Sequence, residues 1–302
     1  MDAPPRLFDR ALLIERRRRA DKAGAETFLL ERVAADLAER LTAVQRRFEL
    51  AVDLGTPGAA LTNVLMKSGQ IGRLVVCEPL AEQRTGALRV AGDEEVLPFA
   101  PGSLDLVVSA LALQWVNDLP GTLVQIRRAL KADGLLLAAL IGGDTLIELR
   151  ESFATAEEEI AGGASPRVSP FTDVRTMGSL LQRAGFALPV TDSDRIVVRY
   201  ARLSDLLNDL RRMGATNVLV ERQSTMMRRA ILARAADHYA ERFADADGKI
   251  RATFEVISIS GWSPHESQQQ PLRPGSARTR LADALGVTEQ SAGDKARPPG
   301  RS

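Results

Sequence analysis

Acidic side chains follow three predicted strands, and each stands where it could serve a bound ligand. Asp53 lies in an apolar segment, and Gly55 follows where a glycine lets the backbone approach a ligand closely. Glu78 ends the next apolar segment, and its acceptor-only carboxylate suits a pair of ribose hydroxyl groups. Asp93, with Glu94 beside it, follows a third short segment and could accept from an adenine amino group. The pattern predicts one ligand site that gathers these residues.

The segments that carry these acids alternate with segments of helical periodicity. Apolar runs predict strands at residues 48–54, 74–77, 88–90, 104–109 and 135–141. Helices are predicted at residues 3–22, 25–43, about 60–67 and around Trp115. Such alternation indicates a parallel sheet covered on both faces. Since ligands bind beyond the carboxyl ends of the strands in such sheets, the acids should meet at one edge.

The second half of the chain shows a different pattern. Residues 196–200 and 253–259 largely alternate apolar and polar side chains, which predicts antiparallel edge strands. Residues 203–243 between them predict two or three helices, interpreted as an insertion or lid. Residues 131–134 predict a turn that ends the preceding helix.

The predicted elements suggest three regions along the chain. Residues 1–45 form an N-terminal helical segment, and residues 46–267 form the α/β domain. Residues 268–302, rich in Pro, Gly, Ser and Arg, are predicted to be a flexible tail.

Composition excludes several classes of protein. A formal net charge of +1 on 302 residues does not suggest a nucleic-acid surface. The single cysteine, Cys77, rules out an internal disulfide framework and fits a reducing compartment. The longest apolar run, residues 135–141, is too short to span a bilayer, and the first residues lack the apolar core of a signal peptide. We expect a bacterial-type cytoplasmic protein.

The order of these motifs resembles a known family. Residues 53–55, Glu78, Asp93 and the block 104–120 are similar to the type-11 group of class I S-adenosylmethionine (SAM) methyltransferases. That group includes the malonyl-carrier-protein O-methyltransferases of biotin synthesis. The resemblance implies an α/β, Rossmann-like fold with a mostly parallel seven-stranded sheet, and SAM as cofactor. The cofactor-binding residues that it implies are Asp53, Gly55, Gly58, Glu78, Asp93, Glu94 and Ser109.

Further blocks resemble a narrower group, the respiratory complex I assembly factors described as arginine hydroxylases. These blocks are residues 142–150, 169–171, 183–186, 213–214 and 261–268. With them the likeness extends from about Phe8 to Ala277. It implies that the substrate is a protein, a subunit of complex I, and that this partner holds the chain at the inner membrane.

The glycine loop departs from the family pattern. The family has D-x-G-x-G-x-G, whereas residues 53–59 read DLGTPGA, with Pro57 and Ala59 at the second and third glycines. Proline has no N–H to donate to a carboxylate. Losing one charge-assisted hydrogen bond costs roughly 1.5–3 kcal/mol, or about 10- to 150-fold in affinity, although Gly58 could compensate by shifting the turn. The change predicts weakened SAM binding and also fits a fold that has lost methyl transfer.

Few residues are candidates for catalysis. Asp144 follows the fifth strand at the cofactor edge, and either caps the next helix or takes part in the reaction. His265 follows the last strand, in either a substrate-side loop or a structural loop anchored by Trp262. An iron site would need His238 as well, with Glu266 or Asp144 as the carboxylate. Because His238 lies in a polar helical run that predicts a surface position, no metal is predicted.

Other distinctive residues favour structural roles. Trp115 is interpreted as a packing anchor, Cys77 as a small apolar residue, and residues 16–19 as a solvated helix face or a contact to an acidic partner. Three functions stay open: methyl transfer that relies on positioning, to a protein or a carrier protein; modification of an arginine on a complex I subunit; and a non-catalytic assembly role.

Overall fold

The computed structural model describes residues 6–79, 87–223, 225–269, 283 and 286. Those up to His265 form one compact unit, and Glu266 begins a second. The predicted tail, residues 268–302, lies almost wholly outside the described residues.

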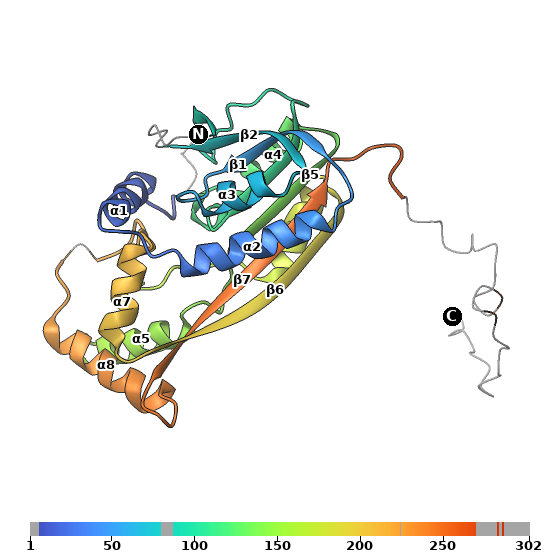
Figure 1. The fold of residues 1–302 in the computed structure, drawn as a ribbon. Coiled ribbons are helices and arrows are strands. Elements are labelled where there is room, and N and C mark those ends of the chain that lie inside the picture. The colour runs from blue at the N-terminus through green and yellow to red at the C-terminus, as the bar shows by residue number, and fades with distance from the viewer. Residues whose placement is uncertain (1–5, 80–86, 224, 270–282, 284–285, 287–302) are drawn as a thin grey trace, which may run out of the picture. The chain divides into compact units, whose positions relative to one another are not determined.

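A seven-stranded sheet forms the centre of the first unit (Figure 1). Its order is β3-β2-β1-β4-β5-β7-β6, and β7 alone runs against the other strands. The strands are β1 (Phe48–Leu54), β2 (Ile71–Glu78), β3 (Leu88–Ala91), β4 (Leu104–Ala110), β5 (Leu130–Ile141), β6 (Ala187–Tyr200) and β7 (Ile250–Trp262). The predicted mostly parallel, seven-stranded fold is confirmed.

Helices cover both faces of this sheet. They are α1 (Arg10–Lys22), α2 (Phe28–Thr42), α3 (Ala60–Lys67), the 3-10 turn η1 (Leu113–Trp115), α4 (Leu119–Ala129), α5 (Ile147–Ala161), α6 (Val174–Arg183), α7 (Leu203–Arg212) and α8 (Arg229–Phe243). In Figure 1, α8 lies along α5 and α7 lies near α1. None of the helices in the described part of the chain has the length and apolar character that a membrane crossing requires.

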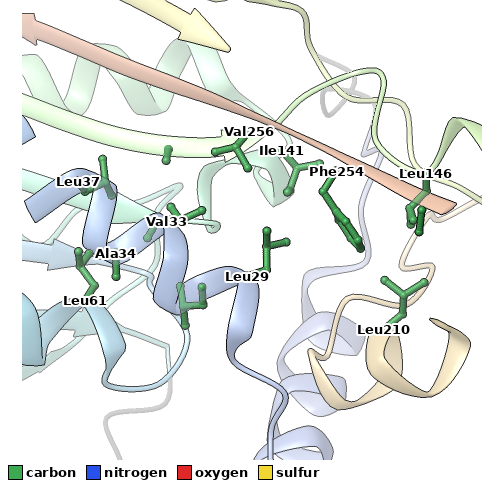
Figure 2. Close-up of a cluster of buried hydrophobic side chains, with 14 of the residues drawn as sticks. Leu29, Val33, Ala34, Leu37, Leu61, Ile141, Leu146, Leu210, Phe254 and Val256 are labelled. Atoms are coloured by element: carbon green, nitrogen blue, oxygen red, sulfur yellow. The ribbon is translucent and has the colours of Figure 1, made fainter. Parts of the chain in front are cut away.

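Period-2 alternation divides the apolar side chains between two cores. In β4, Leu106 and Val108 face the core built with α2 and α3, whereas Val107 faces the core built with α4 and α6. Figure 2 shows the first core, where Leu29, Val33, Ala34 and Leu37 of α2 lie beside Leu61, Ile141 and Val256. The predicted periodicity of residues 25–43 therefore marks a helix that is part of the main core.

The first helix is shorter than predicted. The prediction of residues 3–22 was wrong at the start, because Asp9 caps the helix by accepting from the Leu12 N–H (3.0 Å). Phe8 instead forms an antiparallel bridge with Leu219, so residues 6–9 run as extended chain. Residues 1–5 lie outside the described residues.

The preceding helix ends at Ala129, just before the turn predicted at residues 131–134, but these residues lie within β5, at an irregularity where Leu104 pairs with Leu130 and Leu106 with Leu135. Asp133 has φ +61°, and its N–H donates to the Ser263 carbonyl (3.1 Å). The Ser263 N–H donates in return to the Gly134 carbonyl (2.8 Å). Hydrogen bonds to a segment 130 residues downstream thus extend the strand through a sequence that reads locally as a turn.

Both β6 and β7 are longer than predicted, and of these two strands β6 lies at an edge of the sheet and β7 does not. β7 pairs with β5 on one side and β6 on the other, so the edge prediction for residues 253–259 was wrong. One of its polar side chains bonds within the protein: the Thr253 hydroxyl donates to the buried Glu148 carboxylate, which also accepts the Thr253 N–H (3.1 Å). The helices predicted within residues 203–243 are confirmed as α7 and α8.

Candidate functional site

Asp53 lies in β1 with its side chain fully buried. The Thr62 hydroxyl donates to Oδ2 (2.8 Å), while Oδ1 has no donor among the described residues. Burial raises the pKa of this carboxyl to about 6; the nearby hydroxyls of Thr56 and Thr62 act against that rise, and the charge of Glu78 adds to it. The buried Asp53 side chain therefore lies beneath the loop that follows β1 and supports it.

Gly55 belongs to the motif that begins at Asp53, and it lies against Glu94 of the motif that begins at Asp93. It has φ +69°, and a Cβ placed there would lie 2.1 Å from Oε1 of Glu94. The fully buried Glu94 carboxylate thus fills the space that this glycine leaves open. Gly58 also has a positive φ, +76°, with open space where a side chain would begin.

Two arginines neutralise the acids predicted for the ligand site. Arg10 of α1 contacts Asp93 (3.1 Å) and forms an ion pair with Glu94. Burial acts to lower the pKa of Arg10, but the charges of Glu94 and Asp93 outweigh it and leave that pKa raised. Arg89 of β3 forms an ion pair with Glu78, and both side chains are largely buried.

Arg17, on the same helix as Arg10, also points inward, so residues 16–19 are not simply a solvated face. Its guanidinium donates to the carbonyls of Gly55 (3.4 Å) and Leu111 (3.5 Å). Burial lowers its pKa, and the nearby charges of Glu94 and Glu78 act in the opposite direction. The prediction that this helix face is solvated was wrong for Arg17. Seven residues separate it from Arg10, so both side chains lie on one face of the helix, and that face points inward.

A cavity of about 190 Å³ opens beside these residues. Its lining includes the loop 55–58, the segment Glu78–Pro79 and the apolar side chains of Leu210, Met213 and Phe254. Leu111 (φ +52°) and Leu146 (φ +53°) also line it in left-handed conformations. Such backbone costs roughly 1–2 kcal/mol for a residue other than glycine, and it occurs here after two adjacent strands, β4 and β5.

The predicted cofactor-binding residues divide by their place relative to this cavity. Gly55, Gly58 and Glu78 line it. Asp53 lies beneath the loop, and Ser109 is buried with its hydroxyl donating to the Leu54 carbonyl (2.7 Å). Asp93 and Glu94 are held by Arg10. Their contact with a cofactor stays a prediction.

Asp144 does not cap a helix, so that expectation was wrong. The following helix begins at Ile147, after Leu146 in a left-handed conformation without a side-chain cap. The Asp144 N–H donates to Glu255 (2.9 Å), and its carboxylate forms an exposed ion pair with Arg195. Glu255 also approaches Gly142, which explains the glycine there without a ligand.

The histidines lie far apart. Because β7 is antiparallel, its end pairs with the start of β5, so His265 follows at the edge opposite the cavity. The substrate-side interpretation was therefore wrong. His238 is half-buried rather than on the surface, with Nδ1 3.2 Å from the Ser152 hydroxyl. Within the described residues, no cluster of three or more His, Cys, Asp or Glu side chains could hold a metal ion.

Cys77 is buried as predicted, whereas Trp115 both packs against aromatic rings and lines the cavity, so its role as a packing anchor alone stays a prediction. Trp115 packs edge-on against Phe8 (ring centroids 5.5 Å apart) and Phe171 (5.7 Å). Cys77 is buried in β2, and burial raises the pKa of its thiol to about 12.

Sequence reasoning missed three polar residues of the site: Arg10, Arg17 and Gln114. Gln114 lines the cavity, and its buried Oε1 has no donor among the described residues. The signal for the arginines was their spacing on one helix. For Gln114 it was the position between a buried strand and Trp115.

Residues 52–138 match the model of a methyltransferase domain, which covers β1 to β5. The zebrafish protein arginine-hydroxylase NDUFAF5, mitochondrial, is 38% identical over 290 residues, which are 92% of this chain and 89% of that protein. The malonyl-acyl-carrier-protein O-methyltransferase of Xylella fastidiosa is 42% identical over 175 residues, 58% of this chain and 57% of that enzyme.

A solved structure agrees in fold. A candidate methyltransferase from Bacillus halodurans superposes with a TM-score of 0.53 at 15% identity, over 76% of this chain and all of that one. The chain therefore belongs to the class I SAM-dependent methyltransferase family, in the group that includes the proteins named arginine-hydroxylase NDUFAF5.

Proposed function

We propose that the chain binds SAM in the cavity beside the loop 55–58 and modifies a side chain of a protein partner, a subunit of respiratory complex I. One observation carries the proposal: a single cavity is lined both by that loop and Glu78 and by the apolar side chains of Leu210, Met213 and Phe254. A cofactor bound at the loop would thus share the cavity with an acceptor side chain. The relative named arginine-hydroxylase, which aligns along 92% of the chain, supports a protein substrate.

The residues at the loop end fit the groups of SAM. Glu78 supplies acceptor oxygens for ribose hydroxyls, and the buried Oε1 of Gln114 can accept from an amino group. Gly58, which lines the cavity, has open space where a side chain would begin, so the loop backbone is bare there. When bound, SAM would supply a methyl group whose bond to sulfur breaks as its bond to the acceptor forms, leaving S-adenosylhomocysteine.

The chain's own contribution to such a reaction is placement and exclusion of water. The apolar walls at Leu210, Met213 and Phe254 keep water from an acceptor side chain that enters there. Holding two reactants in line can supply roughly 7–11 kcal/mol of a barrier.

Calorimetric titration of SAM into the full chain tests the binding step. Micromolar affinity supports the proposal, and absence of binding up to millimolar SAM refutes it. Glu78→Gln should weaken binding, since an amide loses acceptor capacity, whereas Glu49→Gln on an exposed side chain of β1 is the matched control. Equal affinity in the wild type and the Glu78 variant would refute the site.

The mass of the partner, measured by mass spectrometry after incubation with the protein, identifies the reaction. An added CH2 supports methyl transfer, and an added oxygen supports the reaction in the relative's name. An unchanged mass contradicts an enzymatic role and favours a non-catalytic assembly factor. Deleting the gene should impair NADH-linked respiration under either complex I role.

A second candidate is O-methylation of a malonyl carrier protein in biotin synthesis. It is favoured by the 42% identity to the Xylella enzyme, although the aligned part is little more than half of each chain. A strain lacking the gene would then require biotin, and respiration would be unaffected.

A further inference from the structure

A second cavity, the outer cavity, has a volume of about 280 Å³ and adjoins the first. The residues that line both cavities are Trp115, Leu146, Phe171, Leu210 and Ala215. Within this shared wall, Trp115 and Phe171 pack edge-on with ring centroids 5.7 Å apart. A polypeptide segment in the outer cavity would therefore lie next to the cavity that the loop 55–58 lines.

The charge of the outer cavity is positive. It is lined by Arg16, Arg167, Arg211 and Arg222 and, among the described residues, by no aspartate or glutamate. Two of these arginines have carboxylate partners outside the lining. Arg222 contacts Asp9 (3.2 Å), and Arg167 forms an ion pair with the buried Glu157. Four cations thus face two acids, and the excess lies at the other two arginines.

Arg16 lies in a positive field. Its guanidinium donates to the Asn217 carbonyl, and no carboxylate of the described residues contacts it. Burial lowers the pKa of Arg16, the charges of Arg222 and Arg19 lower it further, and the charge of Asp9 opposes them without outweighing them. A carboxylate that entered the outer cavity would reduce this repulsion between cations.

Arg211 is exposed in the last turn of α7, and its side chain makes no hydrogen bond or ion pair within the described part of the chain. The acids of the same helix, Asp205 and Asp209, are six and two residues before it. Side chains meet on a helix at a spacing of three or four residues, so neither acid reaches Arg211. Its planar fork of donors is therefore open to a carboxylate from outside.

Apolar side chains also line the outer cavity. Leu149 and Phe153 are buried, and Leu207 and Met227 are partly buried. A small inorganic anion would contact the arginines and gain nothing from this apolar surface. A polypeptide segment with both acidic and apolar side chains fits both parts of the lining.

We propose that the outer cavity binds an acidic and apolar segment of the protein partner, next to the side chain that enters the inner cavity. The inference rests on the proposed function and adds the chemistry of the partner. Carboxylates of the segment contact Arg16 and Arg211, while its apolar side chains contact Phe153 and Met227. Aspartates or glutamates should accordingly stand close in sequence to the residue that is modified.

Fluorescence anisotropy of two short labelled peptides with the full chain tests this site. One peptide alternates Glu and Leu, and the other alternates Lys and Leu. Arg211→Glu should lower the affinity for the Glu–Leu peptide by about 2- to 30-fold, because an exposed ion pair is lost and a repulsion replaces it. The same variant should bind the Lys–Leu peptide more tightly than the wild type does, a reversal that a loss of structure would not produce.

Arg183→Glu is the matched control. Arg183 is also exposed in the last turn of a helix, α6, but that helix packs in the other core. The control should bind both peptides as the wild type does. An equal loss of the Glu–Leu peptide in both variants would mean that only the overall charge matters, and it would overturn the inference.

Two other results would also overturn it. One is equal affinity for the Glu–Leu peptide in the wild type and Arg211→Glu. The other is binding to phosphatidylglycerol vesicles but not to the peptide, because the arginines would then serve a lipid surface. These measurements contain no SAM. A chain that binds SAM without selecting the acidic peptide loses this inference alone, whereas a chain that selects the peptide but does not bind SAM refutes the proposed cofactor and keeps the segment site.

Discussion

Replacing Asp53 with asparagine should make the protein more stable at neutral pH. The carboxylate is fully buried, and one of its oxygens has no donor among the described residues. Burial raises its pKa from the ordinary value of 3.8 to about 6. Asparagine keeps the shape and can accept from the Thr62 hydroxyl, but it carries no charge.

The sign follows from proton binding. Since the folded pKa lies above the unfolded one, the folded state binds the proton more tightly. The resulting stability is fully present below pH 3.8 and is lost as the pH rises through about 6. At about 1.4 kcal/mol per pKa unit, the ionised carboxylate costs roughly 3 kcal/mol of unfolding free energy at neutral pH.

Urea unfolding of both proteins at several pH values, from about 4 to about 7.5, measures this cost. The variant's advantage should grow across that range toward roughly 3 kcal/mol, because titration of the other groups largely cancels between the two proteins. An advantage that does not change with pH, or a variant less stable at neutral pH, would refute the reasoning.

Three further predictions concern buried groups. Leu37→Ala, in the core of Figure 2, should cost about 2–5 kcal/mol of unfolding free energy in urea; a loss below about 1 kcal/mol would contradict this packing. With its thiol pKa raised to about 12, Cys77 should react with Ellman's reagent at mildly alkaline pH only after unfolding, and rapid reaction of the native protein would disprove its burial. Glu157→Ala should cost about 3–5 kcal/mol by leaving Arg167 unpaired, with a smaller loss for Glu157→Gln. Although burial opposes it, hydrogen bonding from Ser165 and Arg167 lowers the pKa of Glu157; this stability should be present above pH 4.5 and be lost as the pH falls, and a pH-independent effect would contradict it.

The parallel part of the fold is predictable because its signals are local. Residues 48–54 and 104–109 are largely apolar runs, buried on both faces from Ala51 and Leu106 onward, and residues 25–43 repeat apolar side chains at helical spacing. Elements decided by distant partners were not predictable. Residues 131–134 read as a turn until Ser263 supplies the hydrogen bonds of a strand.

The same contrast holds within the site. The positions of Asp53 and Glu78 follow from the strands that contain them, so their common edge could be predicted. Arg10 and Arg17 could not be placed, because a charged helix is normally solvated unless acids on another element face it. The error for His265 has a topological cause: a strand's direction decides which edge its following loop occupies, and the sequence of β7 does not state its direction.

The contact between Gly55 and Glu94 also limits the order in which this site can change. A side chain at position 55 would collide with the Glu94 carboxylate. Position 94 must therefore lose its long side chain first, and only then does the left-handed backbone at 55 become the remaining obstacle, worth roughly 1–2 kcal/mol. The reverse order passes through an intermediate with both penalties. Related chains should accordingly vary at position 94 while keeping glycine at 55 more often than the converse.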